Sequence, residues 1–395
     1  MAPDPRHVPK DRSSPTPEPE AALPPRPEPL GVRLRHAPVT GILLATCTIL
    51  YAITLVVTLA HSADPVDTAL SSLWSLSLTE STDAFRQLGA LELSRIWLDH
   101  EWWRLLTTGL LHGSLLHLVL NMVALLSIGE WVEHAWGHLR TFALFILSSI
   151  GGGLASLAWC ESPLVLGASA GILGQAGALW FARLAGPAEL KAELAPISAR
   201  RLGILILVCL GLGLLVPGIA QAGHLGGLAV GLLLGAIWST RPLPIRLVLS
   251  GTLAALLGAL VWQGSAPTNR ANYHAILGFR LLEEQRFDAA LNLFNRGLEL
   301  EPESPHFRNA IAYQLALDGV QLDRAEALVL DALAQDRLNP SYLDTLAWVW
   351  CRQSHIEAGL NTLHAAGFLS STPFPELAEH LESCASAAVF HVEHP

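Results

Sequence analysis

Four polar side chains stand in segments of the sequence that are otherwise strongly apolar. Ser169 lies between Gly167 and Gly171, His224 follows an Ala-Gly pair, and His117 and Asn121 are four positions apart. Strongly polar groups are costly inside a bilayer, and those that occur there usually mark a functional site. A serine becomes a good nucleophile when a neighbouring histidine takes its proton. These residue types therefore predict acyl-transfer chemistry within a membrane.

The spacing of His117 and Asn121 places both on one face of a predicted helix. Attack of a serine on a carbonyl creates an oxyanion, and each fixed donor to it contributes about 2.7–4 kcal/mol in measured cases. The two side chains and the N–H of Ser169 are candidate donors. Taken singly, an intramembrane serine is usually a packing hydroxyl and a histidine a satisfied polar partner. The joint presence of all four residues argues against that simpler interpretation.

The elements that must position these residues are membrane helices. Of the 395 residues, 51% are hydrophobic and only 15% are charged, and the mean hydropathy is +0.40, which is typical of a polytopic membrane protein. A hydrocarbon core of ~30 Å requires roughly 17 to 25 apolar residues per helix. Runs of that length predict seven spans, at 41–60, 110–129, 140–159, 164–184, 202–220, 223–240 and 244–263.

The sequence divides into three regions. Residues 1–40 repeat prolines among polar residues and can bury almost nothing, which predicts a disordered arm. Residues 41–265 contain the apolar runs, and residues 267–395 have the composition of a soluble domain with apolar residues at helical spacing. The fold class predicted is all-α, a polytopic membrane helical bundle followed by a soluble α-helical repeat domain.

The third region resembles a series of tetratricopeptide repeats, whose period is ~34 residues. The first copy has the expected residues Leu277, Gly278, Ala290, Phe294 and Pro302. A looser second copy includes Ala312, Ala325 and Ala332, and a third runs from Tyr342 through Gly359, Leu363 and Ala366. Residues 375–388 suit the polar capping helix that such stacks need. We expect a groove that binds a peptide or partner protein, with a purely stabilising appendage as the alternative.

The positions of Lys and Arg in the loops predict the orientation. Basic residues occur in the N-terminal arm, in the loop after the fourth span and in the loop after the sixth, including Arg183, Lys191, Arg200, Arg201, Arg241 and Arg246. All three groups fall on one side if the N-terminus is cytoplasmic. The C-terminal domain and the loop 61–109 then lie on the outer side of the cell (inner) membrane. Trp74, Trp97, Trp102 and Trp103 suggest that this loop lies at the membrane interface, with ordinary belt anchors as the alternative.

The motifs taken together resemble those of the rhomboid intramembrane serine proteases. The resemblance covers about residues 41–240 and rests on Glu101, Trp102, Trp103, Arg104, His112, His117, Asn121, Gly167, Ser169, His224, Gly227 and Gly231. It implies a six-helix core that cleaves transmembrane substrates through a Ser–His dyad. The helix at 244–263 resembles the additional helix of the six-plus-one arrangement found in part of that family.

The resemblance also implies a role for each matching residue. Ser169 would be the nucleophile, His224 the general base and then acid, and His117 and Asn121 the oxyanion donors. Trp103, Arg104 and His112 match structural positions. Gly223, Gly227 and Gly231 predict a stripe on which the fourth and sixth spans approach closely, because small residues four apart allow such contact.

Two positions depart from the family pattern. Leu173 stands where many members have an aromatic residue that stacks on the catalytic imidazole, and Ala170 stands where glycine is usual. Neither change removes a reacting group. We therefore expect other packing to orient His224.

No cofactor or metal is predicted. His134 and His138 lie beside Glu130 and Glu133, but a solvated helix end explains them better than a zinc site. The sequence has no HExxH motif, phosphate-binding loop or basic nucleic-acid patch. Of the five cysteines, Cys47, Cys160 and Cys209 are predicted to be small core residues, whereas Cys351 and Cys384 could pair in an oxidising compartment.

Two other functions are compatible with a polytopic protein. One is a non-catalytic rhomboid-like adaptor that binds transmembrane clients and recruits partners through its repeats. The loss of either the serine or the histidine would favour an adaptor, and both residues are present. The other is a transporter, which would require matching halves with broken helices, and the sequence shows no such internal symmetry. The partners expected are therefore transmembrane substrates, the lipid bilayer and a protein or peptide bound by the repeats, but not a nucleic acid.

Overall fold

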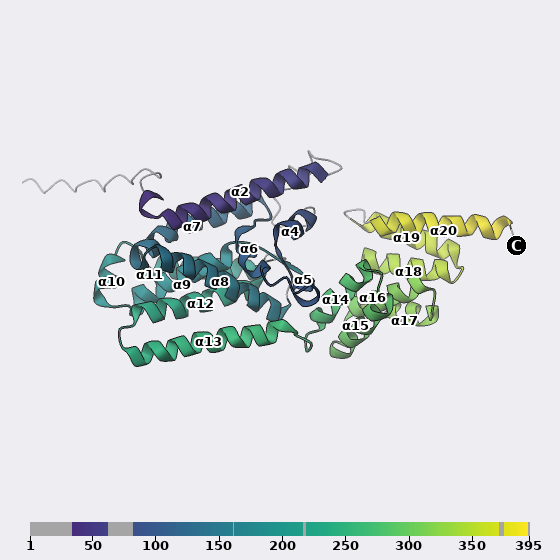
Figure 1. Ribbon diagram of the computed structural model, residues 1–395. Helices are drawn as coiled ribbons and strands as arrows, with labels where there is room; N and C mark the ends of the chain where they lie inside the picture. The colour runs from purple at the N-terminus through teal and green to yellow at the C-terminus, as the bar shows by residue number, and fades with distance from the viewer. Residues whose placement is uncertain (1–33, 62–81, 161, 216–218, 371–374, 394–395) are drawn as a thin grey trace, which may run out of the picture.

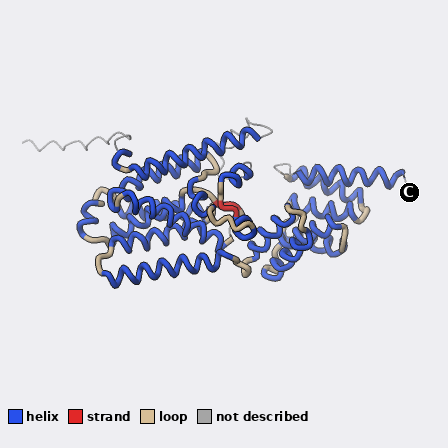
Figure 2. The backbone as a smooth tube through the Cα atoms, in the orientation of Figure 1, coloured by secondary structure: helices blue, strands red, loops and turns tan. Residues whose placement is uncertain are grey.

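The computed structural model describes residues 34–61, 82–160, 162–215, 219–370 and 375–393. These residues form a bundle of long helices, followed at one end by a series of shorter helices that extends away from the bundle (Figure 1). Figure 2 shows that the described chain is helical almost throughout, with a single pair of short strands. Residues 1–33 of the predicted disordered arm lie outside the described residues, and so does Trp74.

Five helices of the described chain are long and apolar enough to cross a membrane. They are α2 (Pro38–His61), α7 (Leu115–Trp136), α8 (His138–Trp159), α12 (Gln221–Ser239) and α13 (Leu243–Ser265). The predicted fourth and fifth spans correspond to α9 (Ser169–Ala185) and α11 (Ala199–Leu215), which have 17 residues each. The all-α, multi-pass character of the prediction agrees with this arrangement, whereas the count of seven spans stays a prediction.

Two predicted spans begin later than expected. The segment 164–184 starts with strand β2 (Leu164–Val165), and its helix begins only at Ser169. The segment 110–129 starts at the end of the 3₁₀ helix η1 (Thr108–Leu110), and α7 begins at Leu115, so His112 precedes the helix. The cause of this second boundary is Ser114, whose side chain accepts from the backbone N–H of His117 and caps the helix.

The helix α12 packs against both α8 and α9. A Cβ at Gly227 would overlap the carbonyl of Ala170, and one at Gly231 would overlap the backbone of Gly174, so these two glycines allow contact with α9. Gly223 instead faces α8, where a Cβ would lie 2.9 Å from the hydroxyl of Ser156. The predicted stripe is therefore divided between two neighbouring helices.

The carboxylate of Glu133 holds the start of α2 against the end of α7. It accepts from the backbone N–H groups of Val39 and Thr40, at 2.8 and 3.0 Å, and from the Thr40 hydroxyl at 2.8 Å. The Nδ1 atom of His138 lies 2.7 Å from it. The expectation of a solvated helix end was wrong for Glu133, because its side chain is buried and caps the free N–H groups of another helix.

The segment before α7 packs over one end of the bundle. It contains α4 (Thr82–Leu88), β1 (Leu91–Glu92), α5 (Leu93–Leu98) and α6 (Arg104–Thr107). β1 pairs antiparallel with β2, with Leu91 opposite Val165 and Glu92 opposite Leu164. This pairing connects the segment 82–107 to the residues that lead into α9. A short helix, α10 (Ala188–Glu193), lies between α9 and α11.

The C-terminal helices pack as successive pairs. They are α14 (Ala271–Glu283), α15 (Phe287–Leu300), α16 (Pro305–Asp318), α17 (Leu322–Gln335), α18 (Pro340–Arg352) and α19 (Ile356–Leu369), followed by α20 (Pro375–Glu393). Gly278 lies against the ring of Phe294, and Gly297 against that of Phe307, so a small residue receives a large one within and between pairs. A disulfide between Cys351 and Cys384 joins α18 to α20.

Candidate active site

Ser169 and His224 meet near the starts of two helices. The Oγ atom of Ser169, the first residue of α9, lies 2.8 Å from the Nε2 atom of His224 in the first turn of α12. The two residues are 55 positions apart in the sequence. A separation of 2.8 Å is normal for a hydrogen bond that involves a hydroxyl. The imidazole can therefore take the hydroxyl proton directly.

The loop before α9 determines where Ser169 lies. The backbone N–H of Gly167 donates to the carbonyl of Thr108 at 3.0 Å, and the Thr108 hydroxyl donates to the carbonyl of Val165 at 2.6 Å. The backbone of Gly167 has a φ of +127°, a conformation that residues with a Cβ rarely adopt. A Cβ there would also lie 2.9 Å from the His117 ring. Glycine is therefore required at this position for two independent reasons.

His117 and Asn121 lie on consecutive turns of α7. The ring of His117 is beside Gly167, and the amide of Asn121 donates to the carbonyl of His117 at 2.9 Å. Asn121 is buried, and an amide has a second N–H that remains for another acceptor. The ring of His112, which is also buried, makes an edge contact with His117 at a centroid separation of 5.1 Å.

The start of α9 adds backbone donors to the same place. The first N–H groups of a helix have no acceptor within it, and here they belong to Ser169, Ala170 and Gly171. The helix dipole places partial positive charge at this end. The site thus combines a hydroxyl–imidazole pair with N–H groups that can stabilise negative charge.

The other nitrogen of His224 is buried as well. Within the described chain, Nδ1 has no hydrogen-bond partner, so the structure shows a pair and not a triad. Leu173 is fully buried in the core of the bundle. The helix α12, which carries His224, packs closely on α8 and α9.

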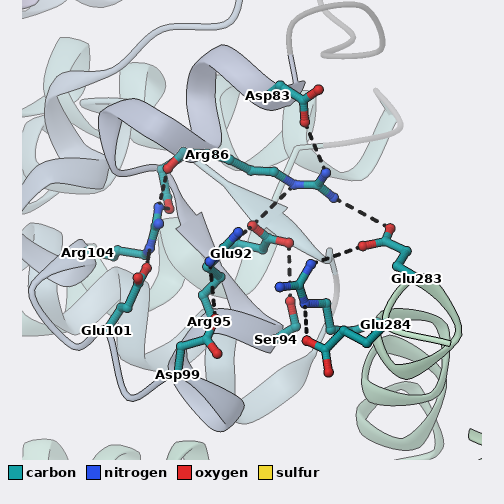
Figure 3. A network of polar contacts seen from close by, with 12 residues as sticks. Asp83, Arg86, Glu92, Ser94, Arg95, Asp99, Glu101, Arg104, Glu283 and Glu284 are labelled. Carbon is teal, nitrogen blue, oxygen red and sulfur yellow. Dashed lines mark hydrogen bonds and ion pairs between the residues drawn. The ribbon is translucent and has the colours of Figure 1, made fainter. Parts of the chain in front are cut away.

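Trp103 and Arg104 stabilise the segment 82–107, which precedes η1 and α7. The guanidinium of Arg104 is buried and donates to the carbonyls of Arg86 and Ala90, at 2.8 Å each, and to Glu101 at 2.5 Å (Figure 3). It also lies over the ring of Trp103, 4.8 Å from its centroid. Arg104, at the start of α6, therefore contacts both α4 and the residue before β1 through one side chain.

Thr108 had not been singled out from the sequence. Its hydroxyl and carbonyl both bind the loop that leads to Ser169. The hydroxyl reaches the carbonyl of Val165, which is 57 positions from Thr108 in the sequence. A threonine in an apolar context gives no signal of such a contact. Only the pairing of distant segments shows this role.

Comparison with known proteins identifies the type of domain that carries this site. Residues 99–241 match the Rhomboid domain family, and the described chain has the membrane helices expected of a multi-pass protein of this kind. The segment 99–241 is therefore similar to a rhomboid domain, as the sequence motifs suggested.

Individual relatives agree with this assignment. The chain is 33% identical over 165 residues to RHOMBOID-like protein 4 of Arabidopsis thaliana, which covers 42% of this chain and 41% of the relative. It is 30% identical over 223 residues to Rhomboid protease GluP of Bacillus subtilis, which covers 54% and 42%. It also matches a protein named Inactive RHOMBOID-like protein 8 of Arabidopsis thaliana, at 30% identity over 102 residues. The matches span about half the length of these relatives or less.

Proposed function

We propose that this chain is an intramembrane serine endopeptidase that cleaves transmembrane helices of membrane proteins. The observation that carries the proposal is the 2.8 Å separation of the Ser169 hydroxyl and the His224 imidazole. The resemblance of the surrounding motifs to rhomboid proteases supports it. No cofactor is needed, because nucleophile, base and electrostatic stabilisation all come from the chain.

The proposed reaction has two halves. In the first, His224 takes the hydroxyl proton while Ser169 Oγ attacks the scissile carbonyl, and His224 then donates the proton to the leaving amine. This step forms an ester between Ser169 and the substrate. In the second half, His224 removes a proton from the water that attacks the ester. His224 then returns this proton to Ser169 Oγ as the new carboxyl end is released. The N–H of Ser169 and the side chains of His117 and Asn121 would bind the oxyanion in each half.

The substrate class follows from the chemistry of a helix in a bilayer. A continuous helix keeps its carbonyl groups hydrogen-bonded and surrounds its backbone with side chains. Ser169 can attack only a carbonyl that has been freed from this ladder. We therefore expect preferred substrates to have helix-breaking residues near the cleavage position.

We also propose a domain division and a membrane orientation. Residues 41–265 would form the protease domain, and residues 267–395 a tetratricopeptide-repeat-like domain that binds a protein or peptide. The paired helices with glycine–phenylalanine contacts support the repeat assignment. The disulfide Cys351–Cys384 supports an outer location for this domain, because disulfides persist in oxidising compartments.

The experiment that tests the proposed function is cleavage of a panel of reporter transmembrane proteins in cells. Wild type, Ser169→Ala and His224→Ala are compared at equal expression. Matched controls are Ser127→Ala, at an exposed position of α7, and His364→Ala, at an exposed position of α19. We expect cleavage by the wild type and both controls, and none by the two site variants.

The main alternative is a non-catalytic adaptor with a rhomboid-like fold, which the existence of a relative named as inactive keeps in view. An adaptor would leave every reporter intact while still binding some of them. Intact reporters with the wild type, or cleavage that persists in both site variants, would therefore overturn the protease proposal.

A further inference from the structure

The first helix of the C-terminal region, α14, packs directly on the segment 82–107. The indole N–H of Trp97 in α5 donates to the carbonyl of Gly264 at 2.8 Å, and its ring lies 4.7 Å from that of Tyr273 in α14. Trp97 is only 8% exposed. Leu277 of α14 belongs to the same buried cluster as Leu91 of β1. The helix α14 is therefore part of this apolar core and not a tethered neighbour.

Charged residues of α4, β1 and the end of α14 also meet between the two regions (Figure 3). Arg86 of α4 lies 3.2 Å from Glu92 of β1 and 3.9 Å from Glu283 of α14. On the helix side, Arg280 pairs with Glu283 and Glu284, at 3.2 Å each. Pairs that are partly open to solvent contribute little stability. These ion pairs are therefore not expected to provide the specific coupling between the two regions.

One partly buried hydrogen bond, from the exposed Asn272, reaches the segment that carries the nucleophile. The side-chain amide of Asn272 in α14 donates to the carbonyl of Cys160 at 3.2 Å. Cys160 ends α8 with φ of +55° and ψ of +37°, a left-handed conformation that is unfavourable for residues other than glycine. The thiol is buried, and its residue makes the turn from α8 into the loop before Ser169. Asn272 thus holds a strained turn in place from outside the rhomboid domain.

The segment after this turn is bonded step by step as far as the active site. The carbonyl of Pro163 accepts from the N–H of Leu93 at 3.0 Å, β2 pairs with β1, and Gly167 donates to Thr108. Ser169 follows two residues later. The helix α14 contacts this segment at two places. It packs on β1 through the apolar cluster, and it binds Cys160, before β2, through Asn272.

We propose that Asn272 is a positioning residue for Ser169, so that the first helix of the C-terminal region helps to set the geometry of the active site. The kinetic part of this inference rests on the proposed protease function. The structural part, that Asn272 orders residues 162–168 through its bond to Cys160, does not. A contact path by itself shows only adjacency, and the coupling has to be measured.

The test uses the full chain and two independent readouts. Asn272→Leu removes the donor, and Asn272→Asp removes it while keeping the side-chain shape, in case the first variant does not fold. The matched control is Asn361→Leu, at an exposed position of α19. The first readout is hydrogen exchange of peptides that cover residues 162–170. The second is kcat and KM for a reporter transmembrane substrate.

We expect faster exchange at 162–170 in both Asn272 variants and a fall in kcat of about two- to tenfold, the range that corresponds to one net hydrogen bond. KM should stay unchanged, because substrate binding is not altered. In a Cys160→Gly background the effect of Asn272→Leu should be smaller, since glycine adopts the left-handed turn without help. The control variant should behave as wild type in both readouts.

The outcomes separate this inference from the protease proposal. Unchanged exchange at 162–170 in both Asn272 variants would overturn the positioning role, whatever the activity. Faster exchange with a wild type that cleaves nothing would retain the ordering of the loop and reject the protease. A rise in KM at constant kcat would also overturn the inference, because it would show that α14 acts on substrate recruitment.

Discussion

Gly231 in α12 lies so close to Gly174 in α9 that a Cβ on Gly231 would overlap the backbone of Gly174. This contact lies on the same two helices as the pair formed by Ser169 and His224, five residues after Ser169 on α9 and seven residues after His224 on α12. The separation of the helices therefore determines whether the hydroxyl and the imidazole can meet.

The variant Gly231→Val should push α12 away from α9. Inserting methyl groups into a tightly packed contact typically costs about 1–3 kcal/mol, and we expect lower thermal stability in detergent together with loss of reporter cleavage. Gly251→Val is the matched control, because a Cβ at Gly251 in α13 would meet no atom within 4 Å. Equal effects of the two variants would contradict the importance of this contact.

Asn121→Ala and His117→Ala should each lower kcat by about 10²–10³, the loss seen when a single oxyanion donor is removed. The protein should still fold and bind substrate. Steady-state cleavage of a purified substrate measures the change, with Leu120→Ala, at a largely exposed neighbouring position of α7, as the control. If Asn121→Ala leaves kcat unaltered, its amide serves only the carbonyl of His117.

Glu133→Leu should release the start of α2 from α7. The change leaves the N–H groups of Val39 and Thr40 without their acceptor, and an unsatisfied buried donor costs about 1–3 kcal/mol. Faster hydrogen exchange over residues 38–43 and a lower unfolding temperature would follow. Glu189→Ala, which removes an exposed ion pair with Arg241, should change neither. Identical behaviour of both variants would count against the capping role.

Cys351 and Cys384 should gain alkyl groups only after reduction of the purified protein. Closing a loop of this length typically stabilises a fold by about 2–4 kcal/mol, so Cys384→Ser should lower the unfolding temperature of the C-terminal helices. Intact mass before and after reduction and alkylation measures the pairing. Alkylation of both thiols without a reductant would show that they are not joined.

The proposed orientation predicts which end of the chain is accessible from outside. In a bacterial host with a permeabilised outer envelope, added protease should remove a tag placed after residue 395 and leave a tag before residue 1 intact. Both tags should be lost when the inner membrane is also opened. Protection of the C-terminal tag in cells whose outer envelope alone is permeabilised would invert the orientation proposed here.

The positions of the membrane helices followed closely from the sequence, because a long apolar run is a local property. The predicted span 41–60 compares with α2 at Pro38–His61, and 223–240 with α12 at Gln221–Ser239. The errors occurred where a long-range contact overrides local hydropathy. The strand β2, inside a predicted helix, forms because β1 provides its partner.

Polar residue types in an apolar context indicated the candidate residues. The distances between their side chains could not be predicted from the sequence. The residues around Glu133 are typical of a solvated helix end. Glu133 is nevertheless buried, because α2 places the backbone N–H groups of Val39 and Thr40 beside its carboxylate. Gly223 has the spacing of the stripe formed by Gly227 and Gly231, yet it faces α8 instead of α9.

The sequence by itself therefore determined which groups are available for chemistry and which segments are apolar enough to carry them. Only the tertiary structure decided that Ser169 Oγ and His224 Nε2 meet at 2.8 Å, that Thr108 holds the loop before Ser169, and that Asn272 reaches Cys160. The physical reason is that polarity and helical period belong to neighbouring residues. Hydrogen bonds between residues 55 to 112 positions apart depend instead on the packing of whole helices.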